Sequence, residues 1–149
     1  MNRKSKLGMV FQPEEQNYLA TLSLKDLPDV PNNLEQILHK ASRAYDRRIK
    51  RMRELAEENQ NLRRKRTPTP AVLMWDLGDE IFKLIEDLDA CGVEIEDLYY
   101  HLTRDIGISK STLKRVVAVR RYIPERITLP INSKWSFFKG APKKYARKR

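Results

Sequence analysis

The chain has 149 residues, enough for one modest domain with extensions, and its formal net charge is +10. This charge makes polyanions the first class of partner to consider, because a positive surface attracts phosphate groups. No run approaches the roughly 18 apolar residues of a membrane-spanning helix, so we expect no membrane association. The N-terminus lacks an apolar signal core, which predicts a cytoplasmic protein that is not secreted, associated with the nucleoid in a prokaryotic or viral setting.

The residue types that usually carry catalysis or bind metals are sparse. Cys91 is the only cysteine, which excludes an intrachain disulfide and a cysteine-based zinc finger. The two histidines, His39 and His101, do not stand in a recognised ligand pattern. We find no nucleophile with a neighbouring base and no phosphate-cradling glycine loop. We therefore expect no cofactor, no metal and no enzymatic activity.

Charge is arranged in blocks along the chain. Basic residues predominate in 40–66, acidic residues in 76–97, and basic residues again in 104–126 and 133–149. A binding face assembled from the last two blocks would be strongly positive, and we expect the acidic block to be turned elsewhere.

Residues 1–33 are predicted to form a flexible N-terminal arm. Pro13 suits the first position of a short helix, with Glu14 and Glu15 in the first turn, where the helix dipole favours anions. The stretch LKDLPDVP then breaks any continuation. The alternative is a docking peptide for a protein partner, which would present Leu19, Leu22, Leu24 and Leu27.

A long helix is predicted over residues 34–66, where no Pro or Gly interrupts the chain and Asn33 or Asn32 can cap the start. Its apolar residues follow heptad spacing. One seam position holds Leu34, Ala41, Arg48, Leu55 and Leu62, and the other holds Leu38, Tyr45, Met52 and Asn59. Two structures fit equally: a coiled-coil homodimer through 34–62, or a single amphipathic helix lying on its own domain. A solvated face is a sufficient explanation for several basic residues of this helix: Arg47, Arg51, Arg63, Arg64, Lys65 and Arg66.

The sequence TPTP at 67–70 predicts a linker, with Thr69 as N-cap and Pro70 as the first residue of the next helix. That helix is expected to run to Ala90 or Cys91 and to stop at Gly92. One side is apolar and the other carries Asp76, Asp79, Glu80, Glu86 and Asp87. We interpret these carboxylates as solvent-facing, because such clusters on helices are much commoner than metal ligand sets.

The stretch DIGISKSTLKRVVAVRRY, residues 105–122, predicts a helix-turn-helix. A helix from about Glu96 to Asp105 is followed by Gly107 and by a second helix that starts near Ser109 or Ser111. Helix-turn-helix motifs join their helices by a short turn that often contains Gly, because the turn needs a backbone angle that a side chain disfavours. The apolar residues Leu102, Ile106, Ile108, Leu113 and Val116 are expected to be buried together.

This arrangement leaves a polar and basic surface on the second helix. We expect Ser109, Lys110, Ser111, Lys114 and Arg115 to be exposed at its N-terminal half, the part that enters the major groove in DNA complexes. Arg and Lys bind guanine, and Ser hydroxyls bind bases or phosphates. Further along, Arg120, Arg121 and Arg126 are predicted to contact backbone phosphates. The alternative is an ordinary helical hairpin with a charged face.

A family resemblance accompanies this motif. Trp75, Gly78 and Ile81, followed by Leu102, Asp105, Gly107, Ser109, Leu113 and Tyr122 with Pro124 just beyond, resemble the helical N-terminal domain of YhcG-type bacterial proteins. The resemblance covers about a third of the chain and implies DNA contact, since that domain is presumed to bind DNA ahead of a PD-(D/E)xK nuclease. Here no Asp or Glu stands two residues before any Lys, so cleavage by this polypeptide is not implied.

The C-terminal segment interleaves aromatic and basic residues. Trp135, Phe137 and Phe138 are expected to fold back onto a thin helical core. Residues 139–149 are predicted to be a basic tail that binds phosphates, through Lys143, Lys144, Arg147, Lys148 and Arg149.

The sequence as a whole predicts an all-α protein: a long N-terminal helix, a helix-turn-helix domain over 70–138 and the basic tail. Its predicted function is non-enzymatic binding of double-stranded DNA, as a regulator, partition factor or DNA-targeting subunit. The alternative is a coiled-coil interaction or scaffold subunit of a larger complex, whose basic surface suits RNA or an acidic partner.

Overall fold

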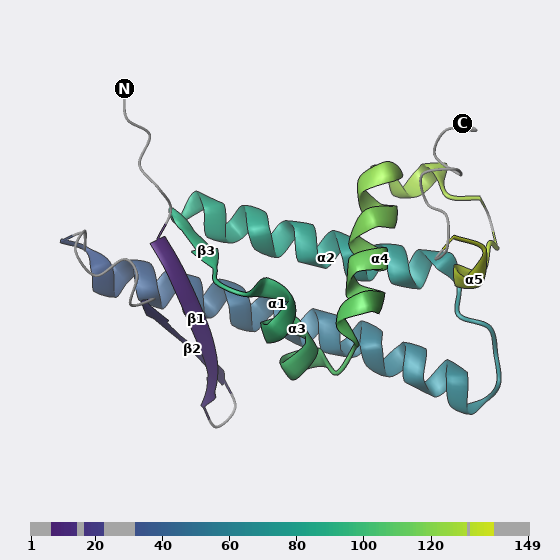
Figure 1. The fold of residues 1–149 in the computed structure, drawn as a ribbon, viewed down its shortest axis with the longest axis horizontal. Helices are drawn as coiled ribbons and strands as arrows, with labels where there is room; N and C mark the ends of the chain where they lie inside the picture. Colours follow the sequence, from purple (N-terminus) through teal and green to yellow (C-terminus); the bar gives the residue numbers. More distant parts are fainter. Residues whose placement is uncertain (1–6, 15–16, 23–31, 131, 139–149) are drawn as a thin grey trace.

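The computed structural model describes residues 7–14, 17–22, 32–130 and 132–138. It is mostly helical, as expected, with a small sheet in addition (Figure 1). The elements are, in order, β1 (Leu7–Glu14), β2 (Asn17–Leu22), α1 (Leu34–Arg64), α2 (Ala71–Ala90), β3 (Val93–Ile95), α3 (Leu98–Ile106), α4 (Lys110–Tyr122), the 3-10 helix η2 (Arg126–Thr128) and α5 (Trp135–Phe138).

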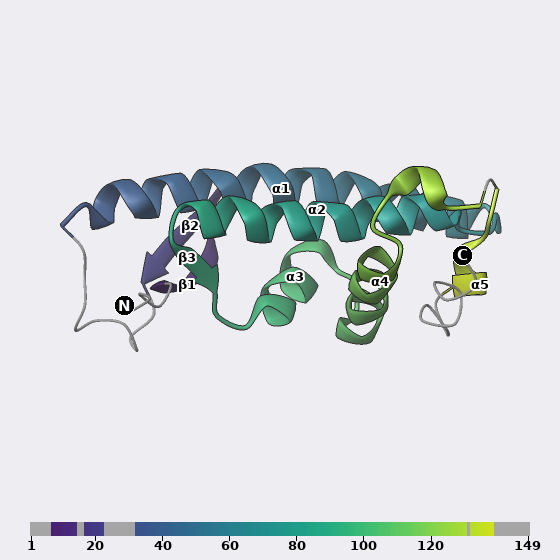
Figure 2. The same ribbon diagram turned by 90° about the horizontal axis from the view of Figure 1, so that it is seen from above.

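The chain folds in two layers. Helices α1 and α2 run antiparallel as a long hairpin that forms one layer (Figure 1). The strands, α3 and α4 lie together on one face of this hairpin (Figure 2). Helix α4 crosses α2 at a steep angle and is seen almost end-on in the second view, so one of its sides faces the hairpin and the other points away from it.

The predicted long helix is present, and the heptad stripe of α1 is covered by the chain itself. Ala41, Tyr45, Met52 and Leu55 are buried, and the helix packs against α2, β2 and α3. Of the two interpretations of the heptads, the amphipathic helix lying on its own domain therefore agrees with the structure. A homodimer through residues 34–62 would need a surface other than this stripe.

The expectation of an all-α fold is wrong in one respect, because β1, β2 and β3 form a sheet in the order β2-β1-β3. Strands β1 and β2 are antiparallel, with Phe11 opposite Ala20, and β1 and β3 are parallel, with Leu7 opposite Val93. The side chains of Met9, Phe11, Tyr18 and Ala20 are buried. Their spacing of two residues is the strand signal that the prediction of a flexible arm passed over.

The N-terminal strands also decide two smaller predictions. Pro13 lies in β1 opposite Tyr18 and does not begin a helix. This position at the end of the hairpin tolerates a residue that cannot donate a backbone hydrogen bond. Of the four leucines of the docking-peptide alternative, Leu19 is exposed on β2. Leu24, Leu27 and the side chain of Leu22 lie outside the described residues.

Both ends of α2 are close to their predicted positions. Pro70, not Thr69, occupies the N-cap position, and Gly92 ends the turn after the helix with a φ of 79°. Trp135 is buried, as predicted, and its N–H donates to the Thr69 carbonyl at 2.8 Å. The side chains of Phe137 and Phe138 lie outside the described residues.

Two kinds of feature are absent from the described residues. None of the helices there is both long enough and apolar enough to cross a membrane. Within the same ranges, His, Cys, Asp and Glu side chains do not gather in groups of three that could hold a metal ion.

Candidate nucleic-acid interface

The helix-turn-helix segment has the local geometry that the sequence predicts. Helix α3 ends at Gly107, whose φ of 75° lies in the left-handed region where glycine is favoured. The Gly107 N–H donates to the Thr103 carbonyl at 3.0 Å. Ser109 then caps α4, because its Oγ accepts a hydrogen bond of 3.3 Å from the Thr112 N–H. The turn and the start of the second helix are therefore fixed by local bonds.

The inner side of α4 is apolar and packs on α2. Leu113, Val116 and Val119 are buried, as are Leu102 and Ile106 of α3. The predicted apolar cluster around the turn is thus present, and Ile108 is its one partly exposed member. Burial of this side fixes the direction in which the opposite side of α4 points.

Two residues of the Trp75, Gly78, Ile81 motif hold α4 against α2. A Cβ added to Gly78 would lie 2.9 Å from the Val116 carbonyl oxygen and 2.9 Å from the Arg120 Cβ. Only glycine permits this close crossing of the two helices. The Trp75 indole Nε1 donates to the Ile123 carbonyl at 2.6 Å, which ties the C-terminal end of α4 to the same helix.

The outer side of α4 carries the predicted basic surface. Ser109, Lys110, Ser111, Lys114 and Arg115 are all exposed, and Arg121 is exposed one turn and a half further on. The helix contains no acidic residue. Among the described residues, the cations Lys110, Lys114, Arg115 and Arg121 have no ion-pair partner, so their charges are available to a ligand.

Tyr99 of α3 borders this surface, and the sequence gave no reason to single it out. The Lys114 Nζ lies 5.9 Å from the centroid of its ring. Burial raises the pKa of the Tyr99 hydroxyl, and the nearby positive charge of Arg121 opposes that shift. The half-buried ring therefore lies near the charges of Lys114 and Arg121, and this position follows only from the packing of α3 beside α4.

Arg120 and Arg126, which were predicted to contact phosphates, are instead engaged within the protein. The Arg120 Nε donates to Asp79 at 3.0 Å, and its guanidinium lies 4.6 Å from the centre of the Phe82 ring. Arg126 binds Asp76 through two hydrogen bonds of 2.8 and 3.2 Å. These bonds raise the pKa of Arg126.

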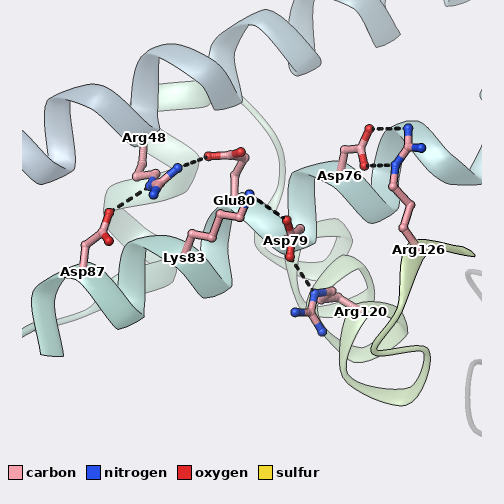
Figure 3. A network of polar contacts seen from close by, with 8 residues as sticks. All are labelled: Arg48, Asp76, Asp79, Glu80, Lys83, Asp87, Arg120 and Arg126. Atoms are coloured by element: carbon pink, nitrogen blue, oxygen red, sulfur yellow. Dashed lines mark hydrogen bonds and ion pairs between the residues drawn. The ribbon is translucent and has the colours of Figure 1, made fainter. Parts of the chain in front are cut away.

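The acidic residues of α2 are largely compensated from inside the chain (Figure 3). The Arg48 Nε donates to Asp87 at 2.9 Å and its Nη1 to Glu80 at 3.2 Å. Burial alone would lower the pKa of Arg48, but Asp87 and Glu80 outweigh it and raise the pKa. Lys83 also contacts Asp79 at 3.2 Å. The expectation that these carboxylates simply face solvent is therefore wrong for Asp76, Asp79, Glu80 and Asp87.

A buried polar cluster connects α3 to α1 and to β1. The Tyr45 hydroxyl donates to Asp105 at 2.5 Å, and the Arg104 Nε donates to the same carboxylate at 2.7 Å. Burial, followed by the bond to Asp105, raises the pKa of Tyr45. His101 is also buried, and its Nε2 accepts the Phe11 N–H at 2.9 Å. The first helix of the motif is thereby joined to both α1 and the sheet.

A cleft of about 750 Å³ opens beside the turn, between α1 and the start of α4. Arg53, Gln60 and Arg63 line it from α1, and Ser109 and Thr112 line it from the helix-turn-helix. Because both elements line one hollow, the end of α1 and the start of α4 are neighbours on the surface.

Comparison with known proteins adds no family to this geometry. No protein-family model matches the chain, and neither a curated protein nor a solved structure matches it. The likeness to YhcG-type N-terminal domains thus stays a prediction made from the sequence, although the packing around Gly78 and Gly107 gives both glycines a physical reason.

The remaining predicted contact residues belong to the C-terminal tail. Lys143, Lys144, Arg147, Lys148 and Arg149 lie outside the described residues. The part of the candidate interface that the structure brings together is therefore the outer side of α4, with Tyr99 at its edge.

Proposed function

We propose that this protein binds double-stranded DNA without catalysing a reaction, and that α4 is its recognition helix. The observation that carries this proposal is the charge of the outer side of α4. Four cations are exposed there without an ion-pair partner among the described residues, whereas Arg120 on the inner side is neutralised. Cations left uncompensated at an exposed helix surface favour a polyanionic ligand.

The geometry of the motif supports DNA as that polyanion. The major groove of B-DNA admits an α-helix, and helix-turn-helix proteins place the N-terminal residues of the second helix against base edges. Helix α4 presents Ser109, Lys110, Ser111, Lys114 and Arg115 at this end. Arg115 and Lys114 suit guanine, while Arg121 and the basic tail suit phosphates.

The competing interpretation, an interaction or scaffold subunit, drew its main support from the heptads. Those residues pack on α2, β2 and α3 of the same chain. We therefore retain DNA binding as the function, in the role of a regulator, partition factor or DNA-targeting subunit.

The test is a pair of substitutions on α4. Lys114→Ala combined with Arg115→Ala should lower affinity for a duplex site selected from a random pool by at least tenfold, because each good base contact contributes about 1–3 kcal/mol. The measurement is fluorescence anisotropy titration of the selected duplex and of a scrambled one.

A matched control uses two exposed cations of α1, Lys40→Ala with Arg43→Ala, which lie far along the hairpin from α4. The control should bind like the parent. Equal binding by the α4 variant and the parent would show that α4 does not read the site.

A further inference from the structure

The end of α1 carries a group of cations that the proposed recognition helix does not explain. We call Arg63, Arg64, Lys65 and Arg66 the α1 end; all four side chains are exposed. Arg64 donates to the Asn61 side chain at 3.0 Å, in an exposed contact within the helix. Among the described residues, the side chains of Arg63, Lys65 and Arg66 have no hydrogen bond or ion pair.

Other arginines of the same helix are differently placed. Arg48 is bonded to two carboxylates of α2, and Arg53 donates to the Asp105 carbonyl at 2.9 Å and to the Tyr18 hydroxyl. The hydrogen bonds of both side chains lie within the fold, and of the two only Arg48 is paired with carboxylates. The α1 end makes no comparable contact, so a role in packing does not account for it.

The cleft beside the turn joins the α1 end to the proposed interface. Arg63 lines this cleft from α1, and Ser109 and Thr112 line it from the first turn of α4. A chain of phosphates that passes the N-terminal end of α4 therefore borders the same cleft as Arg63.

We propose that the α1 end is a second contact for the DNA backbone. The backbone passes the start of α4, crosses the cleft and then binds Arg63 and its neighbours. This inference rests on the proposed function and extends its footprint. The cations lie along the end of a helix and not around an enclosed pocket, an arrangement that suits a polymer of phosphates. Phosphate contacts of this kind position a protein on DNA without reading its sequence.

One acidic side chain works against this contact. Glu57 also lines the cleft, and its carboxylate has no described partner. The other carboxylate of the lining, Asp105, is already bonded by Arg104 and Tyr45. Glu57 is therefore the acidic group that would repel a phosphate in the cleft, and removing its charge should strengthen binding.

The experiment measures affinity of the full chain for a selected and a scrambled duplex over a series of salt concentrations. Arg63→Gln combined with Arg66→Gln should weaken both complexes to a similar degree, on the order of tenfold, and should reduce the slope of log K against log salt by about two. Glu57→Gln should tighten both complexes by about threefold. Lys40→Gln combined with Arg43→Gln is the matched control, since it also removes two exposed cations from α1 and should change little.

Folding is checked by the thermal midpoint of each variant. Arg63→Lys with Arg66→Lys keeps the charge and should retain most of the affinity, which separates charge from side-chain packing. If Arg63→Gln with Arg66→Gln weakens binding no more than the Lys40 and Arg43 control does, the α1 end is not a DNA contact. In that case a loss of binding in the Lys114 and Arg115 variant would still support the recognition helix, whereas an unchanged affinity there would remove the proposed function as well.

Discussion

Arg120 and Arg121 are adjacent in the sequence but lie on different sides of α4, because successive residues of a helix are about 100° apart around its axis. Arg120 faces the hairpin, where it pairs with Asp79 and lies over the rings of Trp75 and Phe82. Arg121 faces outward, exposed and without an ion-pair partner among the described residues. One arginine belongs to the fold and the other is available for a ligand.

This difference shows why the charge of a sequence block is a poor guide to the charge of a surface. The acidic block on α2 was expected to be turned away from the basic residues, yet it binds Arg48, Arg120 and Arg126 (Figure 3). Within the part of the chain that the structure describes, no carboxylate forms an ion pair with the outer side of α4 or with the α1 end, so both keep their charge. Substitutions on the inner side of α4 should therefore lower the free energy of unfolding, whereas substitutions on the outer side should lower the affinity for DNA.

The largest expected effect is on the inner side, at Gly78. Gly78→Ala places a Cβ 2.9 Å from the Val116 carbonyl oxygen, a backbone atom that cannot rotate away. Overpacking of this kind costs about 1–3 kcal/mol. Because the clash is with backbone, we expect a cost near the upper end of this range, about 3 kcal/mol, and alanine is favoured over glycine in helices by about 1 kcal/mol, so the net loss in the free energy of unfolding should be about 2 kcal/mol. Urea denaturation followed by tryptophan fluorescence measures this loss.

A stabilised Gly78→Ala variant would contradict the close crossing of α2 and α4. Gly92→Ala is a useful comparison, since an added Cβ there meets no atom within 4 Å but the φ of 79° is unfavourable. That variant should lose only about 1 kcal/mol, from the backbone conformation alone.

The second prediction compares the two adjacent arginines directly. Arg120→Ala removes a partly buried ion pair and the contacts with two rings, and should lower the free energy of unfolding by about 1.5 kcal/mol. Asp79 keeps its contact with Lys83, which limits the loss. Arg121→Ala should change stability by less than about 0.5 kcal/mol.

Binding should show the opposite order. Arg121→Ala should weaken duplex binding and reduce its salt dependence, because one phosphate contact is lost. Arg120→Ala should leave the affinity of the folded protein close to that of the parent. If Arg120→Ala weakens binding more than Arg121→Ala at a temperature where both are folded, the assignment of the two sides of α4 is reversed.

The helices of this fold were accessible to sequence reasoning because their signals are local. Uninterrupted heptads predicted α1, Gly92 marked the end of α2, and Gly107 with Ser109 defined the turn before α4. The sheet was missed because the two-residue spacing in β1 and β2 was passed over, and because β3 has only three residues and pairs with β1 from more than eighty residues away. Such a pairing leaves no local signal, and the proline in β1 suggested a helix start instead.

The candidate site was predicted only in part for the same reason. Helical periodicity placed Lys110, Lys114 and Arg115 on the outer side, where they are exposed. The neutralisation of Arg120 depends on Asp79, which is distant in the sequence and comes close through the crossing at Gly78. Tyr99 and the cleft likewise arise from contacts between separate helices.

The smallest predicted effect concerns the buried side of the motif and its dependence on pH. Burial and the bond to Asp105 raise the pKa of Tyr45 above its ordinary value of 10.0. The folded protein therefore holds this proton to higher pH than the unfolded chain does. The corresponding stabilisation is complete below about pH 10 and is lost as the pH rises above that value.

The titration of Tyr45 should lower the free energy of unfolding of the parent by about 0.8 kcal/mol between pH 9 and pH 10.5. Tyr45→Phe removes the titrating group, so the variant should be less stable than the parent at pH 8, by about 1 kcal/mol for the lost hydrogen bond, and should lose less stability above pH 10. Urea denaturation at pH 8, 9, 10 and 10.5 gives both curves. Tyr100→Phe is the control, because Tyr100 is exposed and its variant should follow the parent. Parallel curves for the parent and Tyr45→Phe would mean that Tyr45 titrates alike in the folded and unfolded chain, which would contradict both the burial of Tyr45 and its bond to Asp105.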